Sequence, residues 1–450
     1  MDTPICDFVQ QYKKSSSMRM HMPGHKGNSF LGFEEIDITE FDGADDLYHP
    51  EGIIAESEKN ASSLFGCPTY YCTEGSSQCI RAMMYLLMLY AKKQGRKPLI
   101  AAGRNAHKTF VSAAALLDFD IMWLYPDRNN SYLSCNITPD EFEITIQNSE
   151  EKPIALYLTS PDYLGNIADI EGLSEVCRKY GILLVVDNAH GAYLKFLEAS
   201  QHPIDLGADL CCDSAHKTLP VITGGAYIHI SHKLSDFSSK DVKNALAMFG
   251  STSPSYLILQ SLDFCNAYLE KYKENLSLFL PLIQKMKARL EEKGFSFYGD
   301  EPMKLTILAK GYGYTGTELA HILSKNNIFC EFADPDYLVL MPAPETTKDE
   351  LEKLEKVLGS IQKREPITTA PPQISRAEKV LSIREAALSP SETLPISECE
   401  GKTLSAVTVG CPPAVPILVC GEKITKEALD CFRYYGVTEC SVVCGEATSI

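Results

Sequence analysis

The stretch ADLCCDSAHKTLPVITGGAYIHI, Ala208 to Ile230, constrains this chain more than any other part of its sequence. Its first residues predict a short buried strand over 209–213, and a polar turn with Ser214, His216 and Lys217 follows. Burial at a strand end lowers the pKa of a lysine and leaves a neutral amine, which can attack a carbonyl and hold it as a Schiff base. Taken alone, an ordinary loop lysine explains the pattern better. Upstream motifs reverse this interpretation.

The composition indicates a soluble globular protein. With 450 residues, 45% of them hydrophobic, the chain has room for two or three domains and a large core. Its longest apolar runs, such as 83–91 and 182–186, are too short to span a bilayer, and its first residues lack the order of a signal peptide. A net charge of −17 argues against nucleic acid and anionic membranes as partners. The cytoplasm is the expected location.

Sixteen cysteines and several histidines raise the question of a metal or disulfide site. No C-x-x-C pair occurs, and the cysteine spacings do not recur with histidines as they do in zinc sites. The spacing of His21, His25 and His49 fits no helix face. We therefore expect no metal, and reduced, mostly buried thiols.

Short apolar runs alternate with helical patterns in the first half of the chain, which predicts a parallel sheet covered on both faces. A helical region that Pro281 interrupts, a second α/β pattern and a proline-rich stretch follow. The expected organisation is an N-terminal segment (1–52), a large domain (53–253), interdomain helices with a small α/β domain (254–363), a linker (364–375) and a compact C-terminal domain (376–450).

The segment Gly311 to Gly316, GYGYTG, matches the G-x-G-x-x-G fingerprint of dinucleotide binding, with Glu331 and Asp334 downstream. However, it lies late in the chain, and the large sheet has a phosphate turn of its own. We prefer a glycine-rich turn that leads into a helix of the small domain, because isolated fingerprints often mislead.

Motifs with polar residues fall at the expected ends of strands, where open α/β sheets bind their ligands. The first motif, Thr73 to Ser77, leads into a long helix. Amides at a helix start, Gly75 and the hydroxyls of Ser76 and Ser77 form a cradle for an anion, although a plain serine cap explains the motif about as well.

The remaining motifs add a side chain that can stack on a ring and two charged groups. His107, at a predicted helix start, can stack on a flat heteroaromatic ring. In VVDNAHG, Asp187 ends an apolar strand and needs a partner such as a protonated pyridine nitrogen, and the small Ala189 can pack against the ring. Lys217 follows 30 residues after Asp187. Each motif is weak alone, but the ordered set predicts a site for pyridoxal 5′-phosphate.

The chain resembles the short bacterial form of the Orn/Lys/Arg decarboxylase family, and the resemblance extends over almost the whole sequence. The stretches that carry it are HMPGHKG, DLYHPEGI, EGSSQCI, RNAHKTF, LTSPDYLGNIADI, VVDNAHGAY, DSAHKTLP, TSPSYLILQSLD and SIREAALSP.

The resemblance implies an α/β protein of fold type I (aspartate aminotransferase-like), with a mostly parallel seven-stranded sheet and a smaller C-terminal α/β domain. It implies decarboxylation of arginine, lysine or ornithine to the amine and CO2 with pyridoxal 5′-phosphate, in polyamine biosynthesis, by a homodimer. The implied roles are catalysis by Lys217, Asp187 and His107, cofactor contacts from these residues and Ala189, phosphate binding by Gly75, Ser76, Ser77, Ser214 and His216, and a contact of Ser251–Ser253 with the partner's phosphate.

Two departures and several alternatives remain open. Glu74 stands where the resemblance leads us to expect an asparagine-like residue, and CPPAVP, residues 411–416, stands where we expect a tyrosine-proline-proline-glycine pattern. An aminotransferase or another lyase is possible on the same fold, with Arg384 as a clamp for the α-carboxylate, and so is a non-catalytic paralogue that binds the cofactor. The acid that binds the distal cation of the substrate is also open; the candidates are Asp45, Asp46 and Glu331.

Overall fold

The computed structural model describes residues 1–125, 131–373, 376–407 and 413–444. The chain divides into two compact units, each built from separate stretches of sequence. The first unit comprises Met1–Pro98, Ile154–Tyr157 and Ile170–Ser277, and the second unit comprises Leu99–Pro153, Leu158–Asp169 and Leu278–Ile450. The five domains expected from the sequence remain a prediction.

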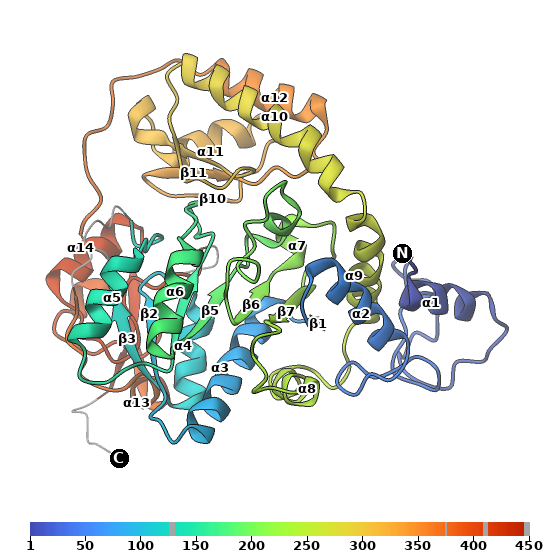
Figure 1. Ribbon diagram of the computed structural model, residues 1–450. Coiled ribbons are helices and arrows are strands. Elements are labelled where there is room, and N and C mark those ends of the chain that lie inside the picture. The colour runs from blue at the N-terminus through green and yellow to red at the C-terminus, as the bar shows by residue number, and fades with distance from the viewer. Residues whose placement is uncertain (126–130, 374–375, 408–412, 445–450) are drawn as a thin grey trace. The chain divides into compact units, whose positions relative to one another are not determined.

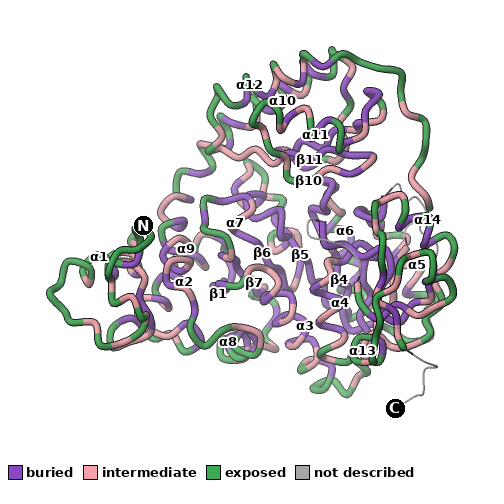
Figure 2. Tube along the Cα trace, turned by 180° about the vertical axis from the view of Figure 1, so that it is seen from behind, coloured by how far each residue is buried: buried purple, intermediate pink, exposed green. Residues whose placement is uncertain are grey.

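Seven strands form a mainly parallel sheet in the order β1-β7-β6-β5-β4-β2-β3, as predicted (Figure 1). β2 pairs with β3 in parallel and β5 with β6 in parallel, whereas β7 is antiparallel to both β6 and β1. Every residue of β5 and β6 is buried (Figure 2), which explains why these strands are nearly continuous apolar runs. The strands are β1 (Thr69–Cys72), β2 (Leu99–Gly103), β3 (Asp120–Leu124), β4 (Ala155–Thr159), β5 (Leu183–Asp187), β6 (Leu210–Asp213) and β7 (Ala226–Ile230).

The helices of the first unit follow the apolar periodicity of the sequence. α2 ends before Gly66, because Gly66 takes the left-handed conformation that ends a helix (φ 69°). The long helix that follows the Thr73–Ser77 motif begins within it, at Gly75. The helices are α1 (Pro4–Lys14), α2 (Ile53–Phe65), α3 (Gly75–Lys93), α6 (Ile170–Tyr180), η1 (Ala192–Phe196), α7 (Ala215–Thr218), α8 (Ser239–Ala247) and α9 (Tyr256–Leu269).

The second unit contains a small antiparallel sheet with the order β10-β11-β9-β8. Its helix α5 begins at Pro139, where Thr138 and Glu141 form a reciprocal capping box. The elements are α4 (Lys108–Leu117), α5 (Pro139–Asn148), β8 (Phe297–Tyr298), β9 (Leu305–Leu308), η2 (Ala309–Tyr312), α11 (Gly316–Ser324), β10 (Phe332–Ala333), β11 (Tyr337–Leu340), α12 (Lys348–Gly359), α13 (Ile383–Leu388), β12 (Ser391–Pro395), η3 (Ile396–Glu398), α14 (Lys426–Tyr434) and β13 (Glu439–Val443).

The prediction that Pro281 interrupts a helix is wrong. α10 runs from Tyr272 to Glu292 with Pro281 inside it, and the break lies between α9 and α10. A proline removes one backbone donor and does not always end a helix, because neighbouring turns and tertiary packing can hold the chain in helical form.

The C-terminal part of the chain shares a hydrophobic core with earlier segments of the second unit. Leu404, Ile417 and Phe432 pack in one cluster with Leu133 and Val339. A buried ion pair also joins the part to β2, since Arg104, the residue after that strand, lies 3.1 Å from Glu422. The last seventy residues therefore complete the core of the second unit.

The glycine-rich segment leads into a helix of the small sheet, as preferred from the sequence. Gly316 begins α11, and a side chain there would collide with the carbonyl oxygen of Tyr337 in β11. The neighbouring strands are antiparallel, whereas a dinucleotide fingerprint requires a parallel β-α-β unit.

Two further expectations concern cysteines and membranes. The cysteines in the described ranges are free thiols and most are buried, as expected. In the same ranges, none of the helices has the length and apolar character required to cross a bilayer.

Candidate active site

Three strands of the first unit end at the same edge of the sheet. β6 is parallel to β5, and β7 is antiparallel to both β6 and β1, so the carboxyl ends of β1, β5 and β6 share one edge. Asp187 is the last residue of β5, and Asp213 is the last residue of β6. The polar residues that follow these strands therefore meet where open α/β sheets bind ligands.

Lys217 lies in α7, directly after the end of β6 (Figure 1). Its Nζ atom lies 3.0 Å from Nε2 of His190. Lys217 is half-buried, and His190 is buried. The sequence interpretation gave His190 no role, although its place three residues after Asp187 at a strand end could have indicated one. An imidazole at this distance can accept a proton from the amine or return it.

Asp187 is only 2% exposed. One of its carboxylate oxygens accepts a hydrogen bond from the hydroxyl of Tyr157 at 3.1 Å, and the other accepts one from the backbone N–H of Ala189 at 3.2 Å. Burial raises the pKa of Asp187, and the charge of Lys217 acts in the opposite direction. A buried carboxylate gains stability from a cationic partner, so this position suits a protonated nitrogen of a ligand. The contribution of Tyr157 was not predicted.

The residues predicted to bind a phosphate lie together at the start of α3. Gly75 is left-handed (φ 71°), and Ser76 and Ser77 occupy the first turn of this 19-residue helix. The hydroxyl of Ser214 donates a hydrogen bond to that of Ser76 at 2.8 Å, which joins the start of α3 to the end of β6. Glu74, the N-cap residue, makes no side-chain capping bond. Amides at a helix start together with hydroxyl groups favour a phosphate.

The remaining predicted cofactor residues take three different positions. His216 lies in α7, with Nδ1 3.0 Å from the carbonyl oxygen of Gly225. Ala189 follows Asp187 and is buried. His107 belongs to the second unit, where it caps α4 by accepting a hydrogen bond from the backbone N–H of Thr109. Its stacking on a ring in the first unit remains a prediction.

A buried network lies around Asp213. Its Oδ2 atom lies 3.1 Å from Nε2 of both His202 and His229, and its Oδ1 accepts a hydrogen bond from the side-chain amide of Asn188 at 2.6 Å. Burial alone would raise the pKa of Asp213, but the charges of the two imidazoles hold it well below its usual range. Because Asn188 follows Asp187, the network joins the ends of β5 and β6.

Donor atoms of His202, Cys211 and Asp213 lie within 4.8 Å of one another, a spacing compatible with a metal ion. The imidazole nitrogens already reach Asp213 at hydrogen-bonding distance. We therefore treat the cluster as a hydrogen-bonded network and propose no metal there. This cluster does not include the histidines considered from the sequence.

Of the three acids considered for the distal cation, Asp45 has a structural role. Its carboxylate accepts hydrogen bonds from the backbone N–H groups of Glu51, Gly52 and Ile54, and it holds the loop before α2. Asp46 accepts a bond from the backbone N–H of Tyr48 in the same loop.

Glu331 and Arg384 lie in the second unit. The hydroxyl of Tyr163 donates a hydrogen bond to Glu331 at 2.9 Å. The guanidinium of Arg384 donates to the carbonyl oxygens of Ala115 and Leu116 at the end of α4. Arg384 thus stabilises a helix end, which argues against its use as a carboxylate clamp.

The structure describes Glu74 fully but the CPPAVP motif only in part. The carboxylate of Glu74 accepts a hydrogen bond from the backbone N–H of Ser251 at 2.5 Å, so it joins the start of α3 to the Ser251–Ser253 turn. The residues 411 and 412 of the CPPAVP motif lie outside the described residues.

The edge of the first unit therefore combines an amine with a proton acceptor beside it, a buried carboxylate and a helix start with hydroxyl groups. Asp187 tests whether a cofactor with a cationic ring nitrogen fits this edge of the sheet. Its raised pKa reflects a buried carboxylate, which such a nitrogen would stabilise. The residues present fit pyridoxal 5′-phosphate.

Comparisons with solved structures agree with this architecture. The Francisella novicida lysine decarboxylase LdcF matches with a TM-score of 0.81 at 18% identity, over 98% of this chain and 81% of that chain. Escherichia coli constitutive lysine decarboxylase matches with a TM-score of 0.79 at 17% identity, over 98% and 82%. The chain thus has the α/β architecture of fold type I.

Sequence comparisons are more specific. The model of the family described as "Orn/Lys/Arg decarboxylase, major domain" matches residues 3–294. Among full-length relatives, "Arginine decarboxylase" of Bacillus subtilis (strain 168) is 26% identical over 460 residues, which cover 95% of this chain and 92% of that protein. "Uncharacterized protein YaaO" of the same organism is 30% identical over 467 residues, which cover 95% and 93%. The chain belongs to the Orn/Lys/Arg decarboxylase family and is an amino-acid decarboxylase.

Proposed function

We propose that this protein removes the α-carboxylate of a basic amino acid as CO2, with pyridoxal 5′-phosphate as its cofactor. The observation that carries the proposal is the pair formed by Asp187 and Lys217 at the ends of two adjacent parallel strands, next to the start of α3. Family membership supports the reaction class.

The cofactor supplies an electron-accepting ring that takes up the electron pair left behind when CO2 departs. Asp187 keeps a proton on the ring nitrogen, because its buried carboxylate is stabilised by a cation. Lys217 would hold the cofactor through its Nζ atom. Nε2 of His190, 3.0 Å from Nζ, can accept a proton from this amine and return it.

Binding and orientation belong to other residues. The first-turn amides and hydroxyls of Ser76 and Ser77, with Gly75 and Ser214, bind the phosphate. Ala189 would leave space for the ring, and the family resemblance assigns His107 the role of stacking on it. His216 is held by the carbonyl oxygen of Gly225 and so fixes the loop that carries Lys217.

Arginine is the substrate to test first. Relatives named arginine decarboxylase match this chain over 93–96% of its length, whereas relatives named lysine decarboxylase match over 57–59%.

The test incubates purified protein and pyridoxal 5′-phosphate with L-arginine, L-lysine or L-ornithine while CO2 and amine are quantified. We expect equal amounts of CO2 and amine from at least one substrate, with the highest kcat/KM for arginine. A keto acid without CO2 would establish an aminotransferase instead. No product from any of the three, although the cofactor is bound, would leave a non-catalytic paralogue.

A further inference from the structure

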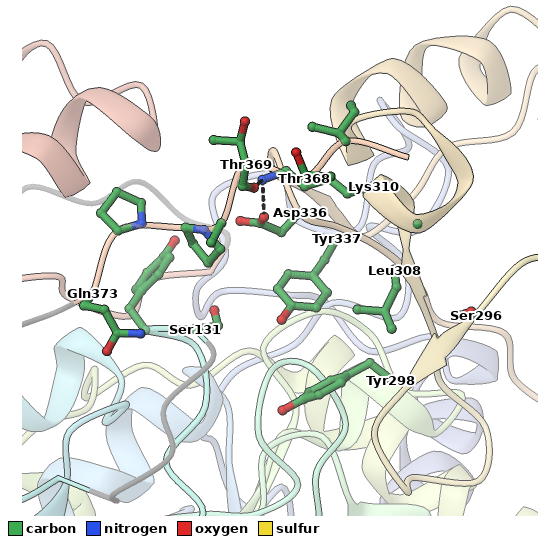
Figure 3. Close-up of a pocket in the computed structure, with 16 residues that line it drawn as sticks. Ser131, Ser296, Tyr298, Leu308, Lys310, Asp336, Tyr337, Thr368, Thr369 and Gln373 are labelled. Carbon is green, nitrogen blue, oxygen red and sulfur yellow. Dashed lines mark hydrogen bonds and ion pairs between the residues drawn. The ribbon is translucent and has the colours of Figure 1, made fainter. Parts of the chain in front are cut away.

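A cavity of about 580 Å³ lies in the second unit, between the small sheet and the proline-rich stretch that follows α12. This volume is typical of small-molecule sites. None of the lining residues is among those assigned to the candidate active site. The cavity is lined by Ser131, Tyr132, Ser296, Tyr298, Leu308, Lys310, Gly311, Asp336, Tyr337 and the segment 367–373 (Figure 3).

Aromatic rings form part of the cavity wall. The rings of Tyr298 and Tyr337 have centroids 5.7 Å apart at an interplanar angle of 51°, and Tyr132 also lines the cavity. Figure 3 shows the rings of Tyr298 and Tyr337 on the same side of the opening as Leu308. The face of a tyrosine ring attracts ammonium and guanidinium groups.

Lys310 is the cation among the lining residues, but its ammonium is already saturated. Nζ lies 2.7 Å from Oδ1 of Asp336, donates to the carbonyl oxygen of Thr369 at 2.6 Å, and also donates to the hydroxyl of Tyr434. A lysine has three donor protons, and these three contacts use all of them. An anionic ligand would therefore find no available ammonium in this cavity.

The carboxylate of Asp336, which lines the cavity, still has an oxygen atom without a donor in the part of the chain that the structure describes. Asp336 is 7% exposed, and its Oδ1 takes the contacts from Lys310 and from the hydroxyl of Tyr434, which donates at 2.8 Å. Its buried Oδ2 accepts no hydrogen bond from any described residue, and the same is true of Oδ2 of Asp334. In Figure 3 this second oxygen of Asp336 points away from Lys310. A buried oxygen without a donor gains free energy from a ligand that supplies one.

The charges of the residues at the cavity also favour a cationic ligand. Asp334 and Asp336 carry two negative charges against the single positive charge of Lys310. Burial raises the pKa of the nearby Asp334 to about 6, and the charge of Lys310 only partly offsets this effect.

We propose that this cavity binds a small organic cation with amine or guanidinium groups, which contact the second carboxylate oxygen of Asp336 and the tyrosine faces. The product of the proposed reaction belongs to this chemical class, so the choice of ligand, although not the existence of the site, rests on the proposed function. The enzyme would then have a site for its product or a related amine outside the candidate active site.

The test titrates the holoenzyme with 1,4-diaminobutane, and separately with 4-aminobutylguanidine, in a calorimeter. In parallel, the visible absorbance of the bound cofactor reports ligand at the candidate active site. We expect one more ligand per chain than the absorbance change accounts for. Asp336→Asn should weaken this additional binding at least tenfold and leave the absorbance titration unchanged, and 1,4-butanediol, which has the same length without charge, should not bind there.

Control variants separate the site from general effects. Asp349→Asn, on the exposed start of α12, should bind as the wild type does. Lys310→Gln removes the ammonium that neutralises Asp336 and should tighten binding, whereas Tyr298→Leu should weaken it. If Asp336→Asn does not fold, the affinities of Lys310→Gln and Tyr298→Leu for the cations test the site instead.

The proposal is overturned if Asp336→Asn binds the cations as the wild type does, if all binding follows the absorbance, or if 1,4-butanediol binds equally well. Additional binding in a protein that releases no CO2 would support the site and refute the proposed function. Release of CO2 without additional binding would refute the site and support the proposed function.

Discussion

Lys217 is one of four lysines that directly follow a histidine, together with Lys26, Lys108 and Lys233. We expect borohydride reduction of the holoenzyme to attach the cofactor to Lys217, because its Nζ lies at the strand edge beside His190. Mass spectrometry of the peptides identifies the site. Lys217→Ala should abolish CO2 release, whereas Lys233→Ala, at an exposed lysine after β7, should retain it. A labelled peptide with Lys26 or Lys108 would contradict the assignment.

Asp187→Asn tests the second partner of the cofactor. The amide is nearly the same size and keeps the contact with Tyr157, so the fold and much of the absorbance of the bound cofactor should persist. Turnover should fall by several orders of magnitude, because an amide does not stabilise a protonated ring nitrogen. Near-normal kcat in this variant would mean that the carboxylate has only a structural role.

The network around Asp213 should give a stability that depends on pH. The pKa of Asp213 is lowered from 3.8, so its contribution is present above pH 3.8 and is lost as the pH falls further. Burial acts to lower the pKa of His229, but Asp213 raises it above 6.5, so this contribution is complete below pH 6.5 and is lost as the pH rises through the raised pKa.

Asp213→Asn should therefore lower the free energy of unfolding by about 3–5 kcal/mol between pH 3.8 and 6.5, the usual effect of breaking a buried ion pair. The difference should shrink at higher pH. Urea unfolding at several pH values measures it, with the exposed Asp42→Asn as control. A difference that stays constant from pH 5 to pH 9 would show that the histidines carry no charge in the fold.

The sequence indicated those site residues whose position in the fold follows from the residues next to them in the chain. Asp187 and Lys217 each follow an apolar strand, and Ser76 begins a helix, so local pattern was sufficient for them. His190, three residues after Asp187, could have been assigned in the same way, but Tyr157 could not. The role of Tyr157 depends on which strands lie side by side, and that information is not local.

At the scale of elements, the start of α3 depends on a left-handed glycine. Gly75 (φ 71°) and Gly95 (φ 62°) lie at the two ends of this helix, and an added Cβ at Gly95 would meet open space. An alanine in this conformation costs about 1–2 kcal/mol at either position. Only Gly75→Ala should also raise the Kd for pyridoxal 5′-phosphate, because it displaces the amides of Ser76 and Ser77. Equal affinity in both variants, measured by absorbance titration, would exclude α3 as the phosphate cradle.

Capping residues explain why most helix starts were predictable. Thr138 and Glu141 cap α5 reciprocally, a pattern that is complete within four residues. The prediction at Pro281 failed for the opposite reason. Whether a proline ends a helix depends on how the surrounding elements pack, and the sequence around Pro281 does not contain that information.

At the scale of the molecule, we predict a homodimer. The N-terminal segment presents a group of exposed apolar side chains, with Met20 80%, Phe30 76% and Leu31 77% exposed. Clusters of this kind mark interaction surfaces. Replacement of Phe30 and Leu31 by glutamate should give monomers in light scattering and reduce CO2 release, whereas Leu116→Glu, at 57% exposure, should not. A fully active monomer would refute the prediction.

Mixed dimers test whether the two chains share a site. Lys217→Ala subunits mixed with subunits changed at Ser251–Ser253 should recover part of the activity if the turn contacts the partner's phosphate, since one of the two sites keeps all its parts. The hydrogen bond from Ser251 to Glu74 of the same chain offers the other outcome, in which the turn serves its own subunit and no activity returns.

The position of β1 has a consequence for how the protein is made. Its first residue, Thr69, pairs with His229, 160 positions later (229 − 69). At a synthesis rate of roughly 5–20 residues per second, a ribosome needs roughly 8 to 30 s to supply this partner. During that time the hydrogen-bonding edge of β1 lacks its strand, and the nascent chain offers it to chaperones or to other unfinished chains. Slower translation between residues 72 and 226 should therefore increase aggregation more than the same delay after residue 277.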